Sequence, residues 1–357
     1  MIAVDAMGGD LAPQAIVQGA YQAAVRGIPV LLFGDEPQII SILNSVTVDS
    51  KDLWPSLPIS IYHTSQVISM SAEPSKAVLQ EGDSSLVQAV RAVSQGKAQA
   101  IVSAGNSGAA LVAGTLILQR VDGILRPAIG SFLPTRSDSI FCIDIGANTD
   151  CKPEYLEQFA LMGSIYVSMI KNIKQPRVAL LSNGAEPYKG SQSTKQAYDL
   201  LKKTKLNFVG NLEPREMFDD LADVIVCDGF VGNVMLKTVQ GTAKTMVSWI
   251  EAERKKSILY SIGLLLSKGL FKGLKQKIDY AKKGGALLFG VKHPLIIAHG
   301  CSNATAIENA IMYAQMVVDD RIVQRFNEQL SHHLNIQHIS NSYMAAQRAQ
   351  PFEQKQV

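Results

Sequence analysis

Short apolar runs alternate with longer segments of helical spacing along most of the chain. Apolar runs of about four to eight residues are typical of buried strands, and apolar residues at every third or fourth position are typical of helices. We expect strands at 1–4, 28–33, 59–62, 100–103, 128–134, 139–145, 177–182, 207–209 and 224–227. We expect helices at 13–25, 35–46, 84–94, 109–119, 155–171, 193–203, 234–253 and 303–330. This order predicts an α/β fold, a three-layer α/β/α sandwich whose sheet is mostly parallel and Rossmann-like.

The alternation continues to about residue 330 without a linker or an internal repeat. We therefore expect one α/β/α domain over 1–330, which includes a basic segment at 254–283, and a polar tail at 331–357. Hydrophobic residues make up 47% of the 357 residues, enough for a buried core and against disorder. No apolar run reaches the roughly 18 residues that span a bilayer, and we expect no signal peptide because the sequence opens on a strand.

Five polar, glycine-containing loops follow apolar runs, at 5–10, 103–108, 144–148, 183–190 and 227–233. The carboxyl ends of parallel strands share one edge of a sheet and ligands bind there, so these loops predict a single polar site. Glycine lets such loops expose backbone amides, which suit anions, especially ahead of a helix. None of the loops matches Gly-x-Gly-x-x-Gly or Gly-x-x-x-x-Gly-Lys-Ser/Thr, so the pattern favours a small oxyanion over NAD or a nucleoside triphosphate.

Lys189, Asn233 and His299 are the candidate functional side chains. Lys189 stands between a predicted strand and a predicted helix, where an ammonium group can stabilise phosphate or a developing oxyanion. Asn233 can orient a carbonyl or phosphate oxygen, although asparagine is also a common helix N-cap. His299 is either a general base or binding group, or a buried histidine without a functional role.

The sequence gives little support to metal or disulfide chemistry. Aspartates at strand ends either bind a metal or cap neighbouring loops, and this chain has four of them, Asp5, Asp10, Asp144 and Asp228. The four cysteines are scattered without a Cys-x-x-Cys pair, which indicates reduced thiols. No Gly-x-Ser-x-Gly elbow predicts a serine nucleophile. We therefore expect neither a metal nor an organic cofactor.

An ordered series of motifs from residue 1 to about residue 329 resembles the bacterial PlsX-type phosphate acyltransferases. The motifs are IAVDAMGGD at 2–10 with AP at 12–13, SAGN at 103–106 with GA at 108–109, GAN at 146–148, Gly184, Glu186, KG at 189–190, DGF at 228–230 with GNV at 232–234, LKT at 236–238, GGA at 284–286 and HG at 299–300. The resemblance implies a fold similar to phosphotransacetylases and the isocitrate dehydrogenase group. It also implies a homodimer that converts acyl-acyl carrier protein and inorganic phosphate into acyl phosphate for phospholipid synthesis, without a cofactor.

The resemblance implies that Lys189 and Asn233 are the catalytic residues. The other predicted substrate-binding and phosphate-binding residues are Asp5, Gly8, Gly9, Asn106, Gly108, Asn148, Gly184, Glu186, Asp228, Gly232 and His299. In the mechanism we expect, loop amides and Lys189 hold phosphate, phosphate attacks the thioester, and Asn233 stabilises the tetrahedral oxyanion. The implied protein partners are acyl carrier protein and a downstream glycerol-3-phosphate acyltransferase.

The chain departs from the family pattern at two places. Members usually carry a basic pair where this chain has Leu79 and Gln80, and many carry a lysine where it has Ile297. If those cations bind phosphate or the acidic carrier protein, Lys76 or Arg91 are the candidates to replace them here.

Segment 254–283 holds nine lysines and arginines and a single acidic residue, Asp279. A basic helix with an apolar face suits an anionic membrane surface, and a helical hairpin packed on a dimer partner is the alternative. The resemblance favours a peripheral enzyme at the cytoplasmic face of the cell membrane. The predicted membrane-contact residues are Ile262, Leu265, Leu266, Lys268, Leu270 and Lys272.

Three other functions remain open at this stage. A phosphotransacetylase-like enzyme would share the phosphate chemistry and use coenzyme A thioesters. A metal- and NAD-dependent decarboxylating dehydrogenase would share the fold but lacks a nucleotide signature here, and a membrane scaffold would leave the five polar loops unexplained. Nucleic-acid binding has little support, because the basic segment lacks interleaved aromatic residues.

Overall fold

The computed structural model describes residues 1–47, 53–257, 259–260, 263, 266–267, 269, 273 and 284–334. The strands are β1 (Ile2–Asp5), β2 (Val30–Gly34), β3 (Ile59–His63), β4 (Ala100–Ser103), β5 (Ala128–Pro134), β6 (Ser139–Ile143), β7 (Arg177–Leu181), β8 (Asn207–Leu212), β9 (Val224–Val226), β10 (Ala286–Phe289) and β11 (Leu295–Ile297). The α-helices are α1 (Gln14–Val25), α2 (Glu36–Thr47), α3 (Pro74–Gln80), α4 (Ser85–Ser94), α5 (Ser107–Ala113), α6 (Pro153–Lys171), α7 (Gln192–Leu201), α8 (Gly229–Arg254) and α11 (Ala304–Asp319). Shorter helical turns are Trp54–Ser56, Gly114–Leu118 and Pro214–Phe218, and 322–334 is also helical.

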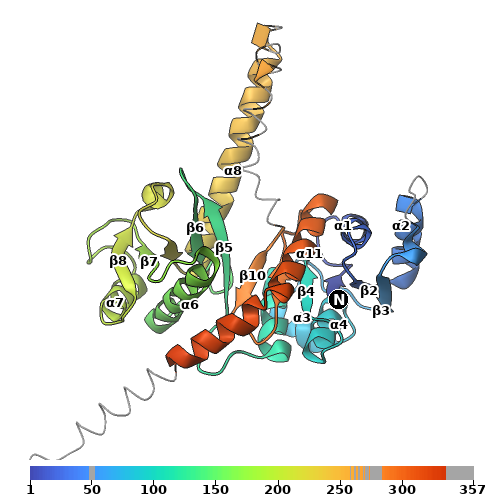
Figure 1. Ribbon diagram of the computed structural model, residues 1–357, viewed down its shortest axis with the longest axis horizontal. Coiled ribbons are helices and arrows are strands. Elements are labelled where there is room, and N and C mark those ends of the chain that lie inside the picture. Colours follow the sequence, from blue (N-terminus) through green and yellow to red (C-terminus); the bar gives the residue numbers. More distant parts are fainter. Residues whose placement is uncertain are drawn as a thin grey trace, which may run out of the picture.

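All eleven strands join one sheet, in the order β3-β2-β1-β4-β11-β10-β5-β6-β9-β7-β8 (Figure 1). Successive side chains of a strand point to opposite faces, and the two hydrophobic cores follow this alternation. Ile2 and Val4 pack on one face with α1, α2, α6, α7 and α11. Ala3 packs on the other face with α3, α4, α5 and the first turns of α8. The predicted α/β/α sandwich with a mostly parallel sheet is therefore confirmed.

The sheet reverses direction at its centre, which the sequence did not predict. Of the ten neighbouring pairs in the described sheet, seven are parallel, but β11–β10, β10–β5 and β5–β6 are antiparallel. Three reversals in succession leave β6, β9 and β7 running opposite to β1, β4 and β11. The expectation that all five polar loops leave the same edge of the sheet is therefore wrong, and the loops form two groups.

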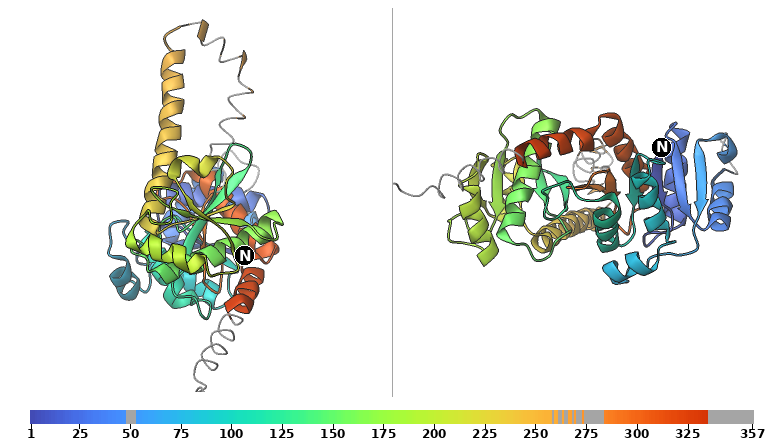
Figure 2. Two further views of the ribbon diagram at one scale, coloured as in Figure 1. Left: turned by 90° about the vertical axis from the view of Figure 1, so that its left-hand side faces the viewer. Right: turned by 90° about the horizontal axis from the view of Figure 1, so that it is seen from below.

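Most predicted elements are present, with a few differences. Strands β10 and β11 and helix α3 were not expected. The predicted helix at 303–330 is two helices, because the chain turns at Arg321, whose φ is 50°. The second helix, 322–334, crosses below the sheet (Figure 2). Its Phe326 packs edge-on against Phe289 of β10. At its far end Leu334 lies against Gly123 in the other half of the molecule.

Helix α8 begins five residues earlier than predicted, because the Asp228 side chain caps it by accepting a hydrogen bond from the Val231 amide at 2.8 Å. Its first turns are packed through Met235 and Leu236, and its later turns project away from the sheet (Figure 1). Segment 254–283 continues from this arm, and the predicted membrane-contact residues Ile262, Leu265, Lys268, Leu270 and Lys272 lie outside the described residues. Leu266 is described, and its side chain is exposed.

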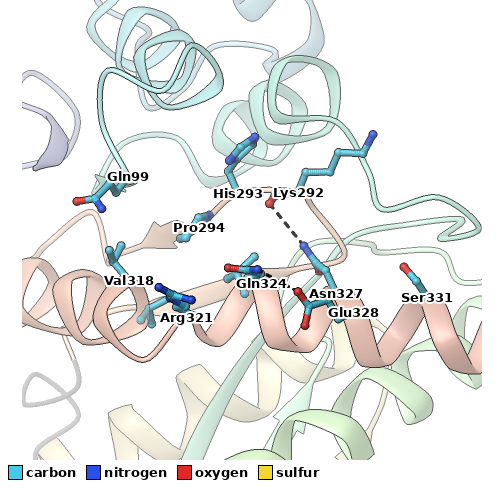
Figure 3. Close-up of a pocket in the computed structure, with 12 residues that line it drawn as sticks. Gln99, Lys292, His293, Pro294, Val318, Arg321, Gln324, Asn327, Glu328 and Ser331 are labelled. Carbon is cyan, nitrogen blue, oxygen red and sulfur yellow. Dashed lines mark hydrogen bonds between the residues drawn. The ribbon is translucent and has the colours of Figure 1, made fainter.

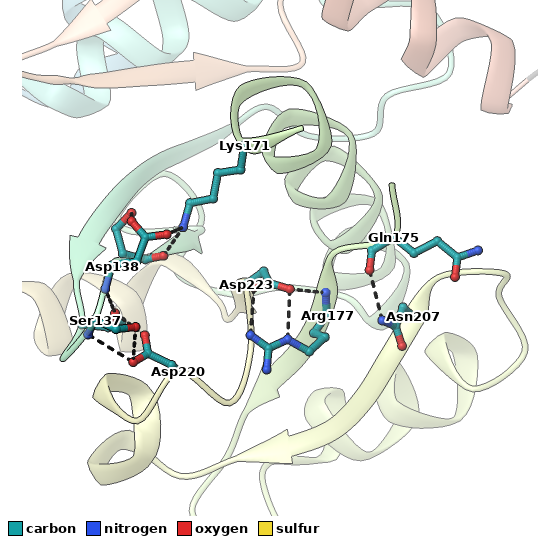
Figure 4. Close-up of polar contacts among 10 residues, drawn as sticks. Ser137, Asp138, Lys171, Gln175, Arg177, Asn207, Asp220 and Asp223 are labelled. Atoms are coloured by element: carbon teal, nitrogen blue, oxygen red, sulfur yellow. Dashed lines mark hydrogen bonds and ion pairs between the residues drawn. The ribbon is translucent and has the colours of Figure 1, made fainter. Parts of the chain in front are cut away.

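A polar network ties together the amino ends of the strands in the β6–β9–β7 half (Figure 4). Arg177, at the start of β7, donates two side-chain hydrogen bonds to the carboxylate of Asp223, at 3.0 and 3.1 Å. Asp223 immediately precedes β9, and this pair lowers the pKa of Asp223 despite its partial burial. Lys171, the last residue of α6, forms an ion pair with Asp138, which lies just before β6. The first pair joins the starts of β7 and β9, and the second joins the end of α6 to the segment before β6.

Within the part of the chain that the structure describes, no helix has both the length and the apolar character needed to span a bilayer.

We expect Gly232→Ala to destabilise the protein by more than about 2 kcal/mol, because overpacking against rigid backbone is costly. A Cβ at Gly232 would lie 1.9 Å from the Asp144 carbonyl oxygen. Gly241, on the same helix, has no atom within 4 Å of the corresponding position. Gly241→Ala should therefore stabilise the helix by up to about 1 kcal/mol. Urea unfolding of both variants measures the difference, and equal free energies of unfolding would contradict this reading.

Candidate active site

The first group of polar loops is organised around the buried carboxylate of Asp5. Its Oδ1 accepts a hydrogen bond from Ser85 Oγ at 2.6 Å, and its Oδ2 accepts one from Ser103 Oγ at 2.7 Å. The amides of Met7 and Gly8 also donate to it. Burial raises the pKa of Asp5, and these hydrogen bonds oppose that rise. Asp5 therefore holds β1, β4 and α4 together, and both of its carboxylate oxygens accept hydrogen bonds from the protein itself.

Three chain segments meet beside Asp5. The Asp10 amide donates to the Gly300 carbonyl at 2.8 Å, which joins loop 5–10 to the His299-Gly300 turn after β11. Gly9 has a φ of 121°, and a Cβ there would lie 3.1 Å from the Gly300 oxygen. Gly8 packs so tightly on Gly105 that a Cβ would lie 2.9 Å from its backbone. The structure thus brings the predicted residues Asp5, Gly8, Gly9 and His299 into one group.

Asn106 also lies in this group, but its side chain holds a neighbouring loop. Its Oδ1 caps α5 by accepting from the Ala109 amide, and its Nδ2 lies 3.0 Å from the Ala72 carbonyl oxygen. Nδ2 also contacts the carbonyl oxygens of Ser69 and Met70. Gly108 packs against Pro74, where a Cβ would lie 2.5 Å from the ring. Both residues position the segment before α3.

The second group of loops is organised around a second buried carboxylate, Asp144. Its oxygens accept hydrogen bonds from the amides of Gly146, Ala147 and Asn148 at 2.8–3.0 Å, and from Asn148 Nδ2 at 2.8 Å. Burial raises the pKa of Asp144, and these hydrogen bonds again oppose the rise. Asn148 Nδ2 also donates to the Pro127 carbonyl oxygen. The amides of this loop therefore point at Asp144 and are not available to an external anion.

The amino end of α8 is packed on the Asp144 loop. The Gly229 amide donates to the Asn148 carbonyl at 2.6 Å, and Gly232 approaches the Asp144 carbonyl. The half-buried Asn233 lies over Gly146, with its Cβ and Cγ 3.8 Å from where a Gly146 Cβ would be. Asn233 therefore lies within α8, on the side of the helix that faces the Asp144 loop. The N-cap of the helix is Asp228 and not Asn233.

Loop 183–190 lies next to this group, at the carboxyl end of β7. Lys189 is half-buried and takes part in no ion pair among the described residues. Its Nζ lies 5.8 Å from the centre of the Tyr188 ring, and its stem passes so close to Gly184 that a Cβ there would lie 2.8 Å away. The Glu186 carbonyl accepts hydrogen bonds from the Lys189 amide and from Asn211 Nδ2.

Helix α8 connects the two groups. Gln240 Nε2 lies 3.3 Å from His299 Nε2, and Lys237 is close enough to act on the same imidazole. Burial lowers the pKa of His299, and the charge of Lys237 lowers it further. Both effects favour the neutral form of the His299 imidazole. Lys237 and Gln240 are functional candidates that were not singled out from the sequence, because only the path of α8 places them beside His299.

A cavity of about 330 Å³ opens at the carboxyl ends of β7 and β9. Its lining residues come from α6, the end of β7, the segments that follow β7, β8 and β9, and the amino ends of α7 and α8. They include Leu180, Ser182, Gly190, Thr194, Cys227, Asp228 and Val231. The cavity therefore touches loops 183–190 and 227–233 at once. Ser182 was not a predicted site residue, since nothing in the sequence shows that it borders a cavity.

A larger cavity, of about 700 Å³, lies elsewhere, near the amino ends of β4 and β11 (Figure 3). It is lined by Gln99, Lys292, His293 and by residues of 317–331, among them Arg321 and Asn327. None of the predicted site residues lines it. We assign the chemistry to the smaller cavity, because ligands of open α/β sheets bind beyond the carboxyl ends of strands.

Lys76 and Arg91, the candidates to replace the cations that the family usually carries, do not lie at loop 183–190. Leu79 is exposed on α3, and Ile297 is buried in β11. Arg91 Nη1 donates to the Gly82 carbonyl oxygen at 2.9 Å, and Lys76 is exposed on α3. Both therefore belong to the Asp5 side of the molecule.

No group of three or more His, Cys, Asp or Glu side chains in the described ranges is arranged to hold a metal ion.

Comparison with known proteins identifies the fold and the family. Residues 1–325 match the model of a family described as fatty acid synthesis protein. A phosphate acyltransferase from Moorella thermoacetica is 45% identical over 323 residues, 90% of this chain and 93% of the relative. A phosphate acyltransferase from Geotalea uraniireducens is 44% identical over 330 residues, 92% of this chain and 94% of the relative.

Solved structures share the fold at low sequence identity. A phosphotransacetylase from Streptococcus pyogenes superposes with a TM-score of 0.54 at 16% identity, covering 89% of this chain and 94% of its own. A 4-hydroxythreonine-4-phosphate dehydrogenase from Klebsiella pneumoniae gives 0.53 at 14% identity, covering 89% and 99%. The fold is thus that of the phosphotransacetylase class of α/β/α proteins. Within it, the chain belongs to the PlsX-type phosphate acyltransferase family.

We expect Lys237→Gln to raise the pKa of His299, because the variant removes a positive charge that disfavours the imidazolium. The pKa should stay below its ordinary value, since burial is the larger cause. Lys244, two turns further along the exposed arm of α8, gives the matched control Lys244→Gln. Histidine NMR titrations of the two variants, with His299→Gln to assign the signal, measure the effect. An unchanged His299 titration in Lys237→Gln would show that the two side chains are not coupled.

Proposed function

We propose that the protein transfers the acyl group of long-chain acyl-acyl carrier protein to inorganic phosphate and so makes acyl phosphate for phospholipid synthesis. Family membership and relatives named phosphate acyltransferase support the reaction class. The observation that carries the site assignment is the cavity that loops 183–190 and 227–233 share. These loops bear Lys189 and Asn233, the two residues that the family resemblance implies are catalytic.

Lys189 would supply the positive charge of the site. Its ammonium group takes part in no ion pair among the described residues, and the next residue along the chain, Gly190, lines the cavity. Lysine is a point charge on a flexible stem, so it can follow an oxyanion that changes geometry during reaction. In water-excluded surroundings such a charge stabilises the transition state more than it does in bulk solvent.

Asn233 would stabilise the tetrahedral oxyanion through its amide group, from the first turns of α8. Phosphate is itself the nucleophile, so no protein nucleophile is needed. One phosphate oxygen forms a bond to the thioester carbonyl carbon, the carbon–sulfur bond breaks, and the proton of hydrogen phosphate ends on the sulfur of the carrier. Positioning of the two substrates then accounts for much of the barrier reduction.

We expect Lys189→Ala to lower turnover by about 10²-fold or more, the usual cost of removing one transition-state donor. The fold should be unaffected, because the ammonium group has no ion-pair partner among the described residues. Lys195→Ala, an exposed lysine on α7, is the matched control. Acyl phosphate formation from palmitoyl-acyl carrier protein and phosphate is the measurement. Near-normal turnover of Lys189→Ala would remove Lys189 from the mechanism.

The same assay, run in parallel with palmitoyl-coenzyme A, shows which thioester is the acyl donor. A strong preference for the carrier protein supports the proposal. Turnover with the coenzyme A thioester alone would place the enzyme with the phosphotransacetylases, and no turnover with either donor would overturn the proposed reaction.

We also propose that the protein is a homodimer attached to the cytoplasmic face of the membrane through the end of the α8 arm. Met246, Trp249, Leu259 and Leu266 are large apolar side chains exposed along this arm. The basic segment 254–283 adds positive charge next to them. Apolar side chains together with basic ones bind anionic lipid surfaces, and acyl phosphate would then be released close to a membrane-bound glycerol-3-phosphate acyltransferase.

Reversing Lys268, Lys272 and Lys275 to Glu should release the protein from vesicles that contain anionic lipid, because attraction to the surface becomes repulsion. The same charge change at Lys195, Lys203 and Lys205, which are exposed on the body, should leave binding largely intact. Vesicle co-sedimentation at low and physiological salt compares the two variants. Equal retention of both by the vesicles would argue against attachment through this segment.

A further inference from the structure

Ser182 carries a buried hydroxyl group that has no hydrogen-bond partner among the described residues. Its side chain is 7% exposed and its Oγ is fully buried. The Ser182 amide is satisfied by the Leu212 carbonyl oxygen, so only the hydroxyl group is unpaired. A buried polar group without a partner costs roughly 1–3 kcal/mol. Ser182 lines the 330 Å³ cavity, which is where a ligand would supply the missing partner.

The surroundings of Ser182 favour an anion. Its Oγ lies 3.0 Å from where a Cβ of Gly190 would be, so it sits directly beneath the Lys189-Gly190 segment. The cavity wall includes Ser191 and Thr194 from the first turn of α7, and Asp228 and Val231 from the first turn of α8. Two helices therefore present their amino ends to one cavity, and both end dipoles are positive.

One acidic group opposes a fully deprotonated anion. Asp228 lines the cavity, and its Oδ1 accepts a hydrogen bond from the Val231 amide at 2.8 Å. A carboxylate beside a bound oxyanion is repulsive unless the anion carries a proton that it donates to the carboxylate. Hydrogen phosphate carries such a proton at neutral pH, whereas sulfate does not.

We propose that this cavity is the subsite for inorganic phosphate, with the Ser182 hydroxyl donating to a phosphate oxygen and Asp228 accepting from the phosphate P–OH group. The inference rests on the proposed function for its substrate, and it adds one residue, Ser182, a proton-accepting role for Asp228 and a selectivity between anions. Ser182 is a binding residue, and Asp228 distinguishes protonated from fully deprotonated anions. The volume beyond a single phosphate and the apolar wall of Leu156, Leu180 and Pro214 leave room for the thioester end of the acyl donor.

The test is calorimetric titration of the full-length chain with inorganic phosphate, in the absence of an acyl donor. We expect Ser182→Ala to weaken phosphate binding about 5- to 20-fold, the loss of one hydrogen bond to a charged ligand. Its stability should be unchanged or higher, since the hydroxyl group has no partner in the free protein. Thr64→Val is the matched control: Thr64 Oγ1 is another buried hydroxyl without a partner, but it follows β3, at the opposite edge strand of the sheet.

The role of Asp228 is tested by comparing phosphate with sulfate. The natural chain should prefer phosphate by about tenfold or more, because sulfate has no proton to donate. Asp228→Asn keeps a good helix cap and should reduce this preference, since an amide also donates to sulfate. An unchanged preference in Asp228→Asn would overturn the role of Asp228.

Steady-state kinetics separates this inference from the proposed function. Ser182→Ala should raise the KM for phosphate and leave the KM for palmitoyl-acyl carrier protein unchanged. A rise in the acyl donor's KM alone, or phosphate binding equal to that of the natural chain, would overturn the phosphate subsite. Phosphate binding that depends on Ser182 in a chain that forms no acyl phosphate would overturn the proposed reaction and leave the subsite standing.

Discussion

Two buried carboxylates, Asp5 and Asp144, hold the polar loops on which the rest of the structure depends. A buried charge is tolerated only when hydrogen bonds replace water, and each of these aspartates accepts four or more from its own loop, from neighbouring strands or, for Asp5, from Ser85 of α4. The amides that would otherwise bind an external anion are consequently directed inward. In the loops after β1 and β6, the amides that donate to these aspartates therefore stabilise the fold. Groups free to meet a ligand lie instead at loop 183–190 and at the amino ends of α7 and α8.

The layers could be predicted well from the sequence, because the spacing of apolar residues shows which faces of a strand or helix are buried. Ile2, Ala3 and Val4 divide between the two cores as their alternation requires. The sequence did not predict the reversal in the middle of the sheet, since the four apolar residues of β10 look the same whether their neighbours run parallel or antiparallel. The sequence identified candidate polar residues, but it did not show in which direction their side chains point. A strand-end aspartate or asparagine reads the same in sequence whether it faces a ligand or, like Asn106, caps its own helix.

Helix α8 unites features that lie far apart in the molecule. Its first turns pack on the Asp144 loop through Gly232, its middle meets His299 through Gln240, and its end carries the exposed Trp249. A straight helix of 26 residues is roughly 39 Å long. On the proposed function, one rigid element then links the reacting centre to the surface where an apolar product is handed on. The close packing around Gly232 fixes the direction in which that element leaves the sheet.

An unpaired hydroxyl group is weak evidence for a ligand on its own, as Thr64 and Ser84 show, since they are unpaired at positions that line neither described cavity. Ser182 differs in its surroundings: a cavity, two helix amino ends and a lysine without an ion pair all adjoin it. Proteins retain destabilising features where binding recovers their cost, so local strain and function tend to coincide. Phosphate in the cavity would give the Ser182 hydroxyl group a partner and would lie at the amino ends of α7 and α8. One ligand then accounts for both features, whereas close packing of the free chain would leave neither a cavity nor an unpaired hydroxyl group there.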